Sequence, residues 1–171
     1  MKLSTPIFSS LVAVLFFVAC EPKKTTDDYN KSAAAKIIKH DYKGAIQDLD
    51  KVVELSPTDA GAYFNRALTK LNAEDYNGAI EDYNKTIELK PAEGWAYLDR
   101  GDAKSKLKDL KGAIQDYTKA FEIDPTNAQA MLNRANCKLT LGDQPGACAD
   151  FRMASNLGNQ QATQALMTTC K

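Results

Sequence analysis

The stretch Asp75–Pro91 reads D-Y-N-G-A-I-E-D-Y-N-K-T-I-E-L-K-P, and it decides the fold of the chain. The same pattern returns with substitutions at Asp41–Pro57 and Asp109–Pro125, and in weaker form at Asp143–Asn159. The three clear copies end in prolines that are spaced 34 residues apart. A fixed period of this length indicates an array of stacked structural units.

Alignment on these prolines divides the sequence into four units. Their residue ranges are 26–59, 60–93, 94–127 and 128–161. Each unit contains two stretches with apolar residues at three- and four-residue spacing, which is typical of amphipathic helices. An aspartate precedes the second stretch of every unit, where a carboxylate can cap a helix N-terminus. The sequence therefore predicts an all-α fold built from four helix pairs.

Three positions within the unit are restricted in size. Position 20 is always alanine: Ala45, Ala79, Ala113 and Ala147. Position 8 is always small: Ala33, Ala67, Gly101 and Ala135. Position 24 is always bulky: Leu49, Tyr83, Tyr117 and Phe151. Small residues let paired helices approach closely, and the bulky residue fills the space beside them.

This pattern resembles the tetratricopeptide repeat, a 34-residue helix–turn–helix unit. The resemblance implies an α-solenoid of four repeats over residues 28–171. Residues 160–171 carry one apolar edge, and we expect them to form the capping helix that a solenoid needs for solubility. The fourth unit departs from the pattern because Asn159 replaces its final proline.

Position 7 departs from the family more informatively, because arginine stands where leucine is usual. These residues are Arg66, Arg100 and Arg134. Position 23 is aspartate in every unit: Asp48, Asp82, Asp116 and Asp150. Unit one has Ser32 at position 7, so pairing within a unit would leave Asp48 without an arginine. We therefore expect pairing between successive units, Asp48–Arg66, Asp82–Arg100 and Asp116–Arg134, which would fix their register more than stabilise them.

The N-terminal segment resembles a bacterial lipoprotein signal peptide over residues 1–19. Its apolar run, Leu11–Ala19, is too short to span a bilayer, which requires about 20 residues. The tetrapeptide Phe17–Cys20, F-V-A-C, which ends this run, resembles a lipobox with phenylalanine in place of the usual leucine. The resemblance implies cleavage before Cys20 and lipidation of Cys20, with residues 20–27 as a polar linker to the membrane. The alternative is an ordinary secretory signal with an incidental cysteine.

Three further cysteines leave the disulfide pairing open. Cys148 and Cys170 are equidistant from the turn expected near Asn159, so an antiparallel helix pair would place them level. A bridge between them would contribute about 3 kcal/mol. Cys137–Cys148 is a geometric rival, although Cys137 occupies position 10, where a buried small residue is expected. All three cysteines could also be reduced.

Composition argues against several classes of function. The chain has 22 basic and 22 acidic residues, whereas nucleic-acid binding needs a basic surface. His40 is the single histidine, and no serine or cysteine is placed to act with it as a nucleophile. Three cysteines without a nearby histidine do not complete a zinc site, and the glycines are isolated rather than clustered in a phosphate loop. We expect neither an enzyme nor a cofactor.

The resemblance places the first helix of each repeat on the concave side of the solenoid. The residues that would form a partner-binding groove there are Asn30, Ile37, Phe64, Leu68, Trp95, Leu98, Asp102, Leu132 and Asn136. An apolar surface of this kind commonly marks an interaction site, and Phe64 and Trp95 would be its aromatic anchors. We expect an extended or helical segment to bind there.

Some members of the family bind peptide carboxyl termini through a clamp of lysine, asparagine and arginine. Here Asn65 matches one clamp position, but the lysine and arginine positions hold other residues. Those residues are Asn30, Ala34, Trp95, Asp99, Gln129 and Asn133. The sequence therefore predicts an interaction scaffold that does not use this clamp, anchored in the bacterial cell envelope at the periplasmic face or the cell surface. The alternatives are a self-associating structural lipoprotein, with the groove filled by a second copy, and an accessory subunit of an envelope enzyme or assembly machine.

Overall fold

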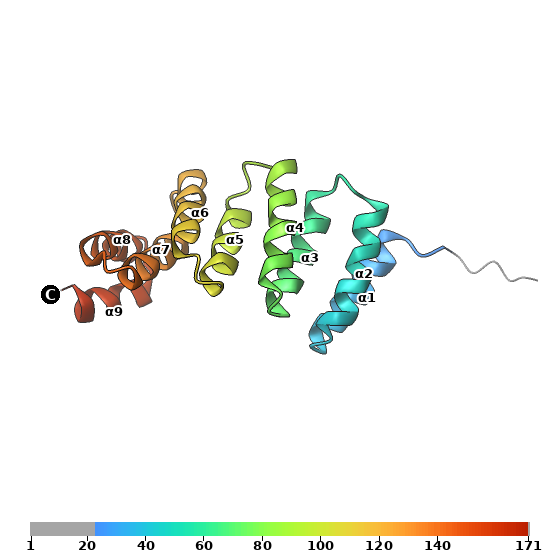
Figure 1. Cartoon of the computed structure of the whole chain (residues 1–171), viewed down its shortest axis with the longest axis horizontal. Coiled ribbons are helices and arrows are strands. Elements are labelled where there is room, and N and C mark those ends of the chain that lie inside the picture. Colours follow the sequence, from blue (N-terminus) through green and yellow to red (C-terminus); the bar gives the residue numbers. More distant parts are fainter. Residues whose placement is uncertain (1–22, 171) are drawn as a thin grey trace, which may run out of the picture.

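The computed structural model describes residues 23–170, and this part of the chain is a single row of helices (Figure 1). No strand occurs among these residues. The helices are α1 (Thr26–Ile38), α2 (Tyr42–Leu55), α3 (Ala60–Asn72), α4 (Tyr76–Leu89), α5 (Gly94–Lys106), α6 (Leu110–Ile123), α7 (Ala128–Thr140), α8 (Gln144–Asn156) and α9 (Gln160–Thr169). The predicted signal peptide and the lipidation site Cys20 lie outside the described residues.

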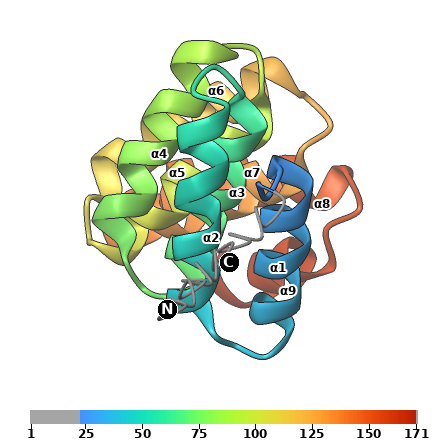
Figure 2. The ribbon, with the colours of Figure 1, turned by 90° about the vertical axis from the view of Figure 1, so that its right-hand side faces the viewer.

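Each unit contributes one antiparallel helix pair, and consecutive pairs stack along the row. The second helix of each pair also packs against the first helix of the next pair. Seen along the row, α2 and α4 lie on one side and α1 lies on the other (Figure 2). First helices of neighbouring units are also in contact: α3 contacts α5, and α5 contacts α7. The structure confirms the predicted solenoid of helix pairs with a final helix, α9, packed on α8.

Two local signals fix the turn inside each unit. An aspartate caps the second helix and accepts a hydrogen bond from the glycine three residues later, as Asp75 does from the Gly78 N–H at 3.0 Å. The residue before this aspartate has a positive φ, which closes the first helix. Glycine serves this purpose in unit four, at Gly142 (φ 85°), whereas Glu74 adopts φ 62° in unit two despite its side chain.

The small residues at positions 8 and 20 are buried and allow the close helix packing. Ala67 and Ala79 are buried beside Tyr83 in unit two. In unit three, a Cβ atom added to Gly101 would lie 2.7 Å from the Tyr117 ring, so only glycine fits there. The Tyr117 ring thus lies closer to the first helix of its unit than an alanine would allow.

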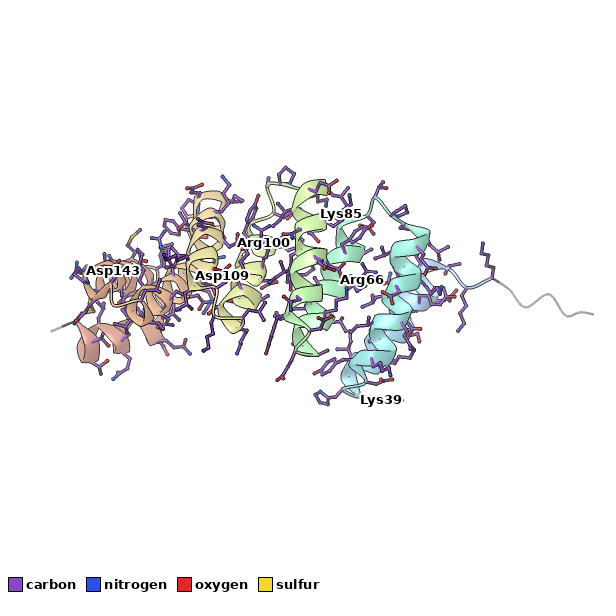
Figure 3. All side chains as sticks on the ribbon, in the orientation of Figure 1. Lys39, Arg66, Lys85, Arg100, Asp109 and Asp143 are labelled. Atoms are coloured by element: carbon purple, nitrogen blue, oxygen red, sulfur yellow. A yellow bond between two sulfur atoms is a disulfide. The ribbon has the colours of Figure 1, made fainter. Side chains whose placement is uncertain are left out.

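The predicted pairing of each arginine with the position-23 aspartate of the preceding unit is wrong, because each arginine binds the position-23 aspartate of its own unit. Arg66 Nη2 lies 2.6 Å from Asp82 Oδ1, and the same 16-residue separation joins Arg100 to Asp116 and Arg134 to Asp150. The proposed pairs Asp48–Arg66, Asp82–Arg100 and Asp116–Arg134 are not formed. Figure 3 labels Arg66 and Arg100 at neighbouring places along the row.

A lysine at position 11 explains why Asp48 does not pair with the arginine of the next unit. Lys70 Nζ lies 2.8 Å from Asp82 Oδ2, and Lys104 and Lys138 occupy the same place in units three and four. In unit one, Lys36 binds Asp48, and this bond, with one from Ser32, lowers the pKa of the Asp48 carboxyl against the opposing effect of its burial. Asp48 therefore has a cation within its own unit and needs no arginine.

The arginines do connect successive units, but through position 25 of the preceding unit. Arg66 Nη1 donates to Asp50 Oδ1 at 2.9 Å, and Arg100 Nη1 donates to Asn84 Oδ1 at 2.7 Å. Arg134 Nη1 donates in the same way to Thr118 Oγ1 at 2.9 Å. Each guanidinium thus binds a carboxylate of its own repeat and an oxygen of the repeat before it.

A disulfide joins the last helix to the repeats. It links Cys148 of α8 to Cys170 just after α9, with a Cα–Cα distance of 5.7 Å, and is the predicted pair. Cys137 is a buried free thiol. Ala165 and Leu166 of α9 pack on the core formed by α7 and α8. Across residues 23–170, no helix is both long and apolar enough to cross a membrane.

Candidate functional site

Two pockets lie along the first helices of the units. The larger has a volume of about 610 Å³ and is lined mainly by α3, α5 and α7. The smaller has a volume of about 270 Å³ and lies between α1 and α3. Asn72 lines both pockets, so they form one continuous surface, which we call the first-helix groove.

Five of the nine predicted partner-binding residues line this groove. Asn30, Ile37 and Leu68 line the smaller pocket. Asp102 and Asn136 line the larger pocket. The smaller pocket has the more apolar lining, since Ala33, Ala34 and Leu49 also line it, whereas asparagines, lysines and carboxylates make up half of the residues that line the larger one.

Phe64 and Trp95 form an aromatic pair on neighbouring first helices. Their ring centroids lie 4.1 Å apart with the planes at 69°, an edge-to-face arrangement. Trp95 remains 37% exposed, and Phe64 also packs on Tyr83, with ring centroids 5.9 Å apart. Leu98 is half-buried against the core around Tyr117 and Cys137. Trp95 is thus the accessible member of this group.

Leu132 was predicted to face the groove, and this is wrong. It is 5% exposed and belongs to the core of α7, α8 and α9. The α9 helix packs beyond unit four, where its Ala165 and Leu166 join this core. The last unit therefore lines the groove with Asn133, Asn136, Cys137 and Thr140 and not with a large apolar side chain.

A pair of half-buried carboxylates lies on α5, and one of the two, Asp102, lines the larger pocket. Asp99 and Asp102 are three residues apart and share one side of the helix. Tyr117 Oη donates to Asp102 Oδ1 at 2.7 Å, and Asn133 Nδ2 donates to the same oxygen at 2.8 Å. No hydrogen bond or ion pair is formed by Asp99, or by Asp102 Oδ2, with any residue in the range 23–170. Asp102 therefore brings an unpaired acceptor oxygen to the groove, and Asp99 adds an unpaired carboxylate one helical turn away on the same helix.

Burial raises the pKa of both carboxyls. For Asp99, desolvation is the main cause and the charge of Asp102 adds to it, giving a pKa of about 6. For Asp102, desolvation raises the pKa, while the hydrogen bonds from Tyr117 and Asn133 and the charge of Lys106 partly oppose this. Negative charge at this pair is therefore costly in the free protein.

Tyr83 places an unpaired hydroxyl beside these carboxylates. The residue is 0% exposed, and its Oη has no hydrogen-bond partner in the described part of the chain. Desolvation raises the pKa of this phenol most, and the charges of Asp99, Asp102 and Asp82 raise it further. Tyr117 occupies the same repeat position but reaches Asp102, whereas unit two has Leu68 where unit three has Asp102.

Sequence reasoning missed Asp99, Tyr83, Tyr117 and Asn133 as parts of a site. Asp99 and Asn133 were considered only as residues that break the family's basic clamp. The two tyrosines were assigned to packing because position 24 requires bulk. The sequence did contain one signal, because tyrosine stands at a position where packing requires only a bulky side chain. A buried phenol normally requires a hydrogen-bond partner, so the two hydroxyl groups indicated polar groups nearby.

Comparison with protein families agrees with this architecture. Two models, each described as "Tetratricopeptide repeat", match the sequence. One matches residues 60–93 and 96–127, and the other matches residues 116–149, so together they cover just over half of the chain. The chain belongs to the tetratricopeptide-repeat family. A comparison with curated proteins gave no match.

Solved tetratricopeptide-repeat structures share the fold. The "MamA 41-end" structure from Desulfovibrio magneticus RS-1 is 22% identical, with a TM-score of 0.75 over 80% of this chain and 77% of that chain. The "First TPR of Spaghetti (RPAP3) bound to HSP90 peptide SRMEEVD" is 23% identical, with a TM-score of 0.65 over 68% of this chain and 93% of that chain. The Arabidopsis OM64 TPR domain is 29% identical, with a TM-score of 0.62 over 65% and 93%.

Proposed function

We propose that this protein is a non-catalytic interaction scaffold that binds a segment of another protein in the first-helix groove. The observation that carries this proposal is the groove itself, which runs along the first helices of four successive repeats and has large exposed apolar side chains in it or on the helices that line it. Leu68 and Trp95 are each 37% exposed. Grooves of this composition suit an extended peptide, which uses apolar anchors for affinity and polar groups for orientation.

The dimensions of the groove also favour a polypeptide over a compact ligand. Its two pockets together involve α1, α3, α5 and α7, so a ligand that used both would contact every repeat. The related Spaghetti domain was solved with the peptide SRMEEVD, which supports peptide binding as a use of this architecture. That peptide is acidic, whereas Asp99 occupies one of the basic clamp positions here. We therefore expect a partner of different charge.

We further propose that the protein is held at the bacterial cell envelope by a lipid on Cys20. The F-V-A-C tetrapeptide and the preceding apolar run support this proposal. Metabolic labelling with an alkyne fatty acid should mark the native chain, and the Cys20→Ala variant should lose both the label and its sedimentation with membranes. Membrane association of an unlabelled Cys20→Ala chain would contradict lipid anchoring.

Groove binding can be tested with a photo-crosslinking amino acid at positions 68 and 95. The control position is Gln115, an exposed residue on the second helix of unit three. We expect a discrete crosslinked partner from positions 68 and 95 and none from position 115. Leu68→Asp and Trp95→Asp should release that partner, and Gln115→Asp should retain it. Retention by both groove variants would overturn the proposal, while crosslinks between copies would favour self-association.

A further inference from the structure

We propose that the Asp99–Asp102 pair receives an arginine or lysine side chain from the bound segment. This inference rests on the proposed function, since it names the chemistry of the partner that the first-helix groove takes. The inference deepens the proposed function, because apolar contacts alone would give the groove no preference for a charged partner.

Every buried aspartate of the repeats carries two cations, and the Asp99–Asp102 pair carries none. Asp82 is bound by Arg66 and Lys70, and Asp116 and Asp150 are bound in the same way by their own arginine and lysine. Asp102 has two neutral donors on one oxygen, and its Oδ2 is without a partner among residues 23–170. Buried charge without a counter-ion is costly, so an external cation would complete the pattern.

The Tyr83 hydroxyl provides an independent indication of a ligand. A buried hydroxyl without a hydrogen bond is unfavourable, and native structures rarely retain one without a reason. Phe64 contacts both the Tyr83 ring and Trp95 of α5, so Tyr83 borders the helix that carries the pair, and the charges of both carboxyl groups raise the pKa of its phenol. A guanidinium or ammonium group bound between the carboxylates would fix their oxygens in place and give the phenol a stable acceptor. The Tyr83 hydroxyl would then donate a hydrogen bond to a carboxylate that the bound ligand holds in place.

The aromatic pair borders the same position. Trp95 lies one helical turn from Asp99 on α5, so the two share a side of the helix. Phe64 contacts both Trp95 and Tyr83. An arginine or lysine that reaches the carboxylates can therefore lay its methylene groups, or its charged group, against an aromatic surface. This arrangement suits an amino-acid side chain with an apolar stem.

Other charged groups line the larger pocket and must be counted. Lys106 and Lys108 lie near the C-terminal end of α5, and Glu74 lies in the turn before α4. Lys106 favours the charged form of Asp102 but forms no ion pair with it. Its side chain is exposed, and therefore it is free to remain in solvent. Lys106 and Lys108 place positive charge near the carboxylate pair and would repel further basic residues of a ligand. The preferred segment therefore carries one basic residue at a defined position rather than several along its length.

A metal ion is a poorer occupant than a basic side chain. Within residues 23–170, no cluster of three or more histidine, cysteine, aspartate or glutamate residues could hold one. The surrounding groups are two phenols, an indole and an amide, which hard cations do not prefer as a set. The same groups are well matched to a guanidinium, which combines hydrogen bonding with stacking. A segment with a single arginine is therefore the occupant to which we commit.

The test uses a displayed pool of capped heptapeptides with a fixed central arginine and random flanking residues. The matched pool replaces the central arginine with citrulline, which has nearly the same shape but no charge. We expect the native chain to retain the arginine pool about tenfold better. Asp99→Asn and Asp102→Asn should each remove most of this preference. Glu81→Gln, which makes the same charge change on the exposed face of α4, should leave it intact.

Two further variants keep the test decisive. Tyr83→Phe removes only the unpaired hydroxyl, and we expect it to weaken retention of the arginine pool several-fold while the chain stays folded by circular dichroism. Trp95→Asp should abolish retention of both pools, because it disrupts the groove rather than the charge preference. Equal retention of the two pools, lost with Trp95→Asp, would overturn the acidic site and leave groove binding standing. Retention that survives Trp95→Asp would count against the proposed function itself.

Discussion

Arg66 binds Asp82, a residue of its own repeat, through two hydrogen bonds: Nη2 to Oδ1 at 2.6 Å and Nε to Oδ2 at 2.8 Å. The arginine side chain therefore crosses between the two helices of one pair, α3 and α4. Its remaining nitrogen, Nη1, reaches back to Asp50 of the preceding repeat. One guanidinium thus holds a helix pair together and sets the position of its neighbour.

A double-mutant cycle in urea unfolding should separate these two roles. We expect a coupling energy of about 1–3 kcal/mol between Arg66 and Asp82, since the pair is largely buried and in direct contact. The Arg66–Asp50 cycle should give a smaller value because Asp50 is partly exposed. Coupling near zero is expected for Asp48 and Arg66, and a large value there would restore pairing between units.

Replacement of Glu74 by glycine should stabilise the chain. Glu74 holds φ at 62°, a left-handed conformation that costs a residue with a side chain about 1 kcal/mol more than glycine. We expect a gain of about 0.5–1 kcal/mol in the free energy of unfolding. Gly142→Ala is the matched control, because Gly142 occupies the same repeat position at φ 85° and should lose stability by a similar amount. A destabilised Glu74→Gly variant would contradict this account of the turn.

Loss of the disulfide should loosen the C-terminal end of the row. The Cys148→Ser and Cys170→Ser double variant removes a cross-link between residues 22 apart, which is worth about 3 kcal/mol. Hydrogen exchange should accelerate in α9 before it does in α3 or α4, since solenoid repeats contact only their neighbours. Uniform acceleration along the whole chain would show instead that α9 supports every repeat equally.

The two equivalent tyrosines should respond differently to removal of their hydroxyl groups. Tyr117→Phe deprives Asp102 of a hydrogen bond, and we expect it to cost about 1 kcal/mol or more. Tyr83→Phe removes a buried hydroxyl that has no partner, so its free energy of unfolding should stay level or rise by up to about 1 kcal/mol. Thermal unfolding of the ligand-free variants measures both. A larger loss for Tyr83→Phe than for Tyr117→Phe would mean that the Tyr83 hydroxyl has a partner in solution.

The raised pKa of Asp99 predicts how stability changes with pH. Its carboxyl titrates near pH 6 in the folded state, compared with an ordinary value of 3.8. The folded state therefore holds the proton more tightly, and this contribution is present below about pH 4 and is lost as the pH rises through 6. Asp99→Asn should be more stable than the native chain at pH 7, by about 1 kcal/mol after allowance for screening.

The stability difference between Asp99→Asn and the native chain should shrink as the pH falls from 7 to 4. Urea unfolding of both chains at several pH values measures it directly. Asp102 and Tyr83 face the same group, so their own substitutions would alter the titration and are left out of this comparison. A difference that is independent of pH would indicate that Asp99 titrates normally.

The sequence predicted the helices and their stacking because both follow from local patterns. Spacing of apolar residues, the aspartate caps and the 34-residue period recur in every unit, so each repeat confirms the others. The disulfide could also be predicted, since the midpoint of Cys148 and Cys170 falls at a turn of an antiparallel pair. Such features depend on distances along one or two helices.

The ion pairs and the acidic site could not be predicted from such local sequence patterns. The partners of Asp48 depended on how far a lysine side chain at position 11 reaches across the helix pair, and residue type does not give that distance. The buried state of Leu132 followed from where α9 packs. The Asp99–Tyr83 neighbourhood joins two units, so its recognition required the rotation between successive repeats.

The residue at position 25 of the last unit limits how a further repeat could be added to the solenoid. In the first three units position 25 holds an oxygen that accepts from the next arginine, but in unit four it holds Arg152. A further repeat of the same design would bring its own position-7 arginine against this cation. Like charges would then meet where the other junctions have a donor and an acceptor. Arg152 thus disfavours extension of the row by a further repeat that carries arginine at position 7.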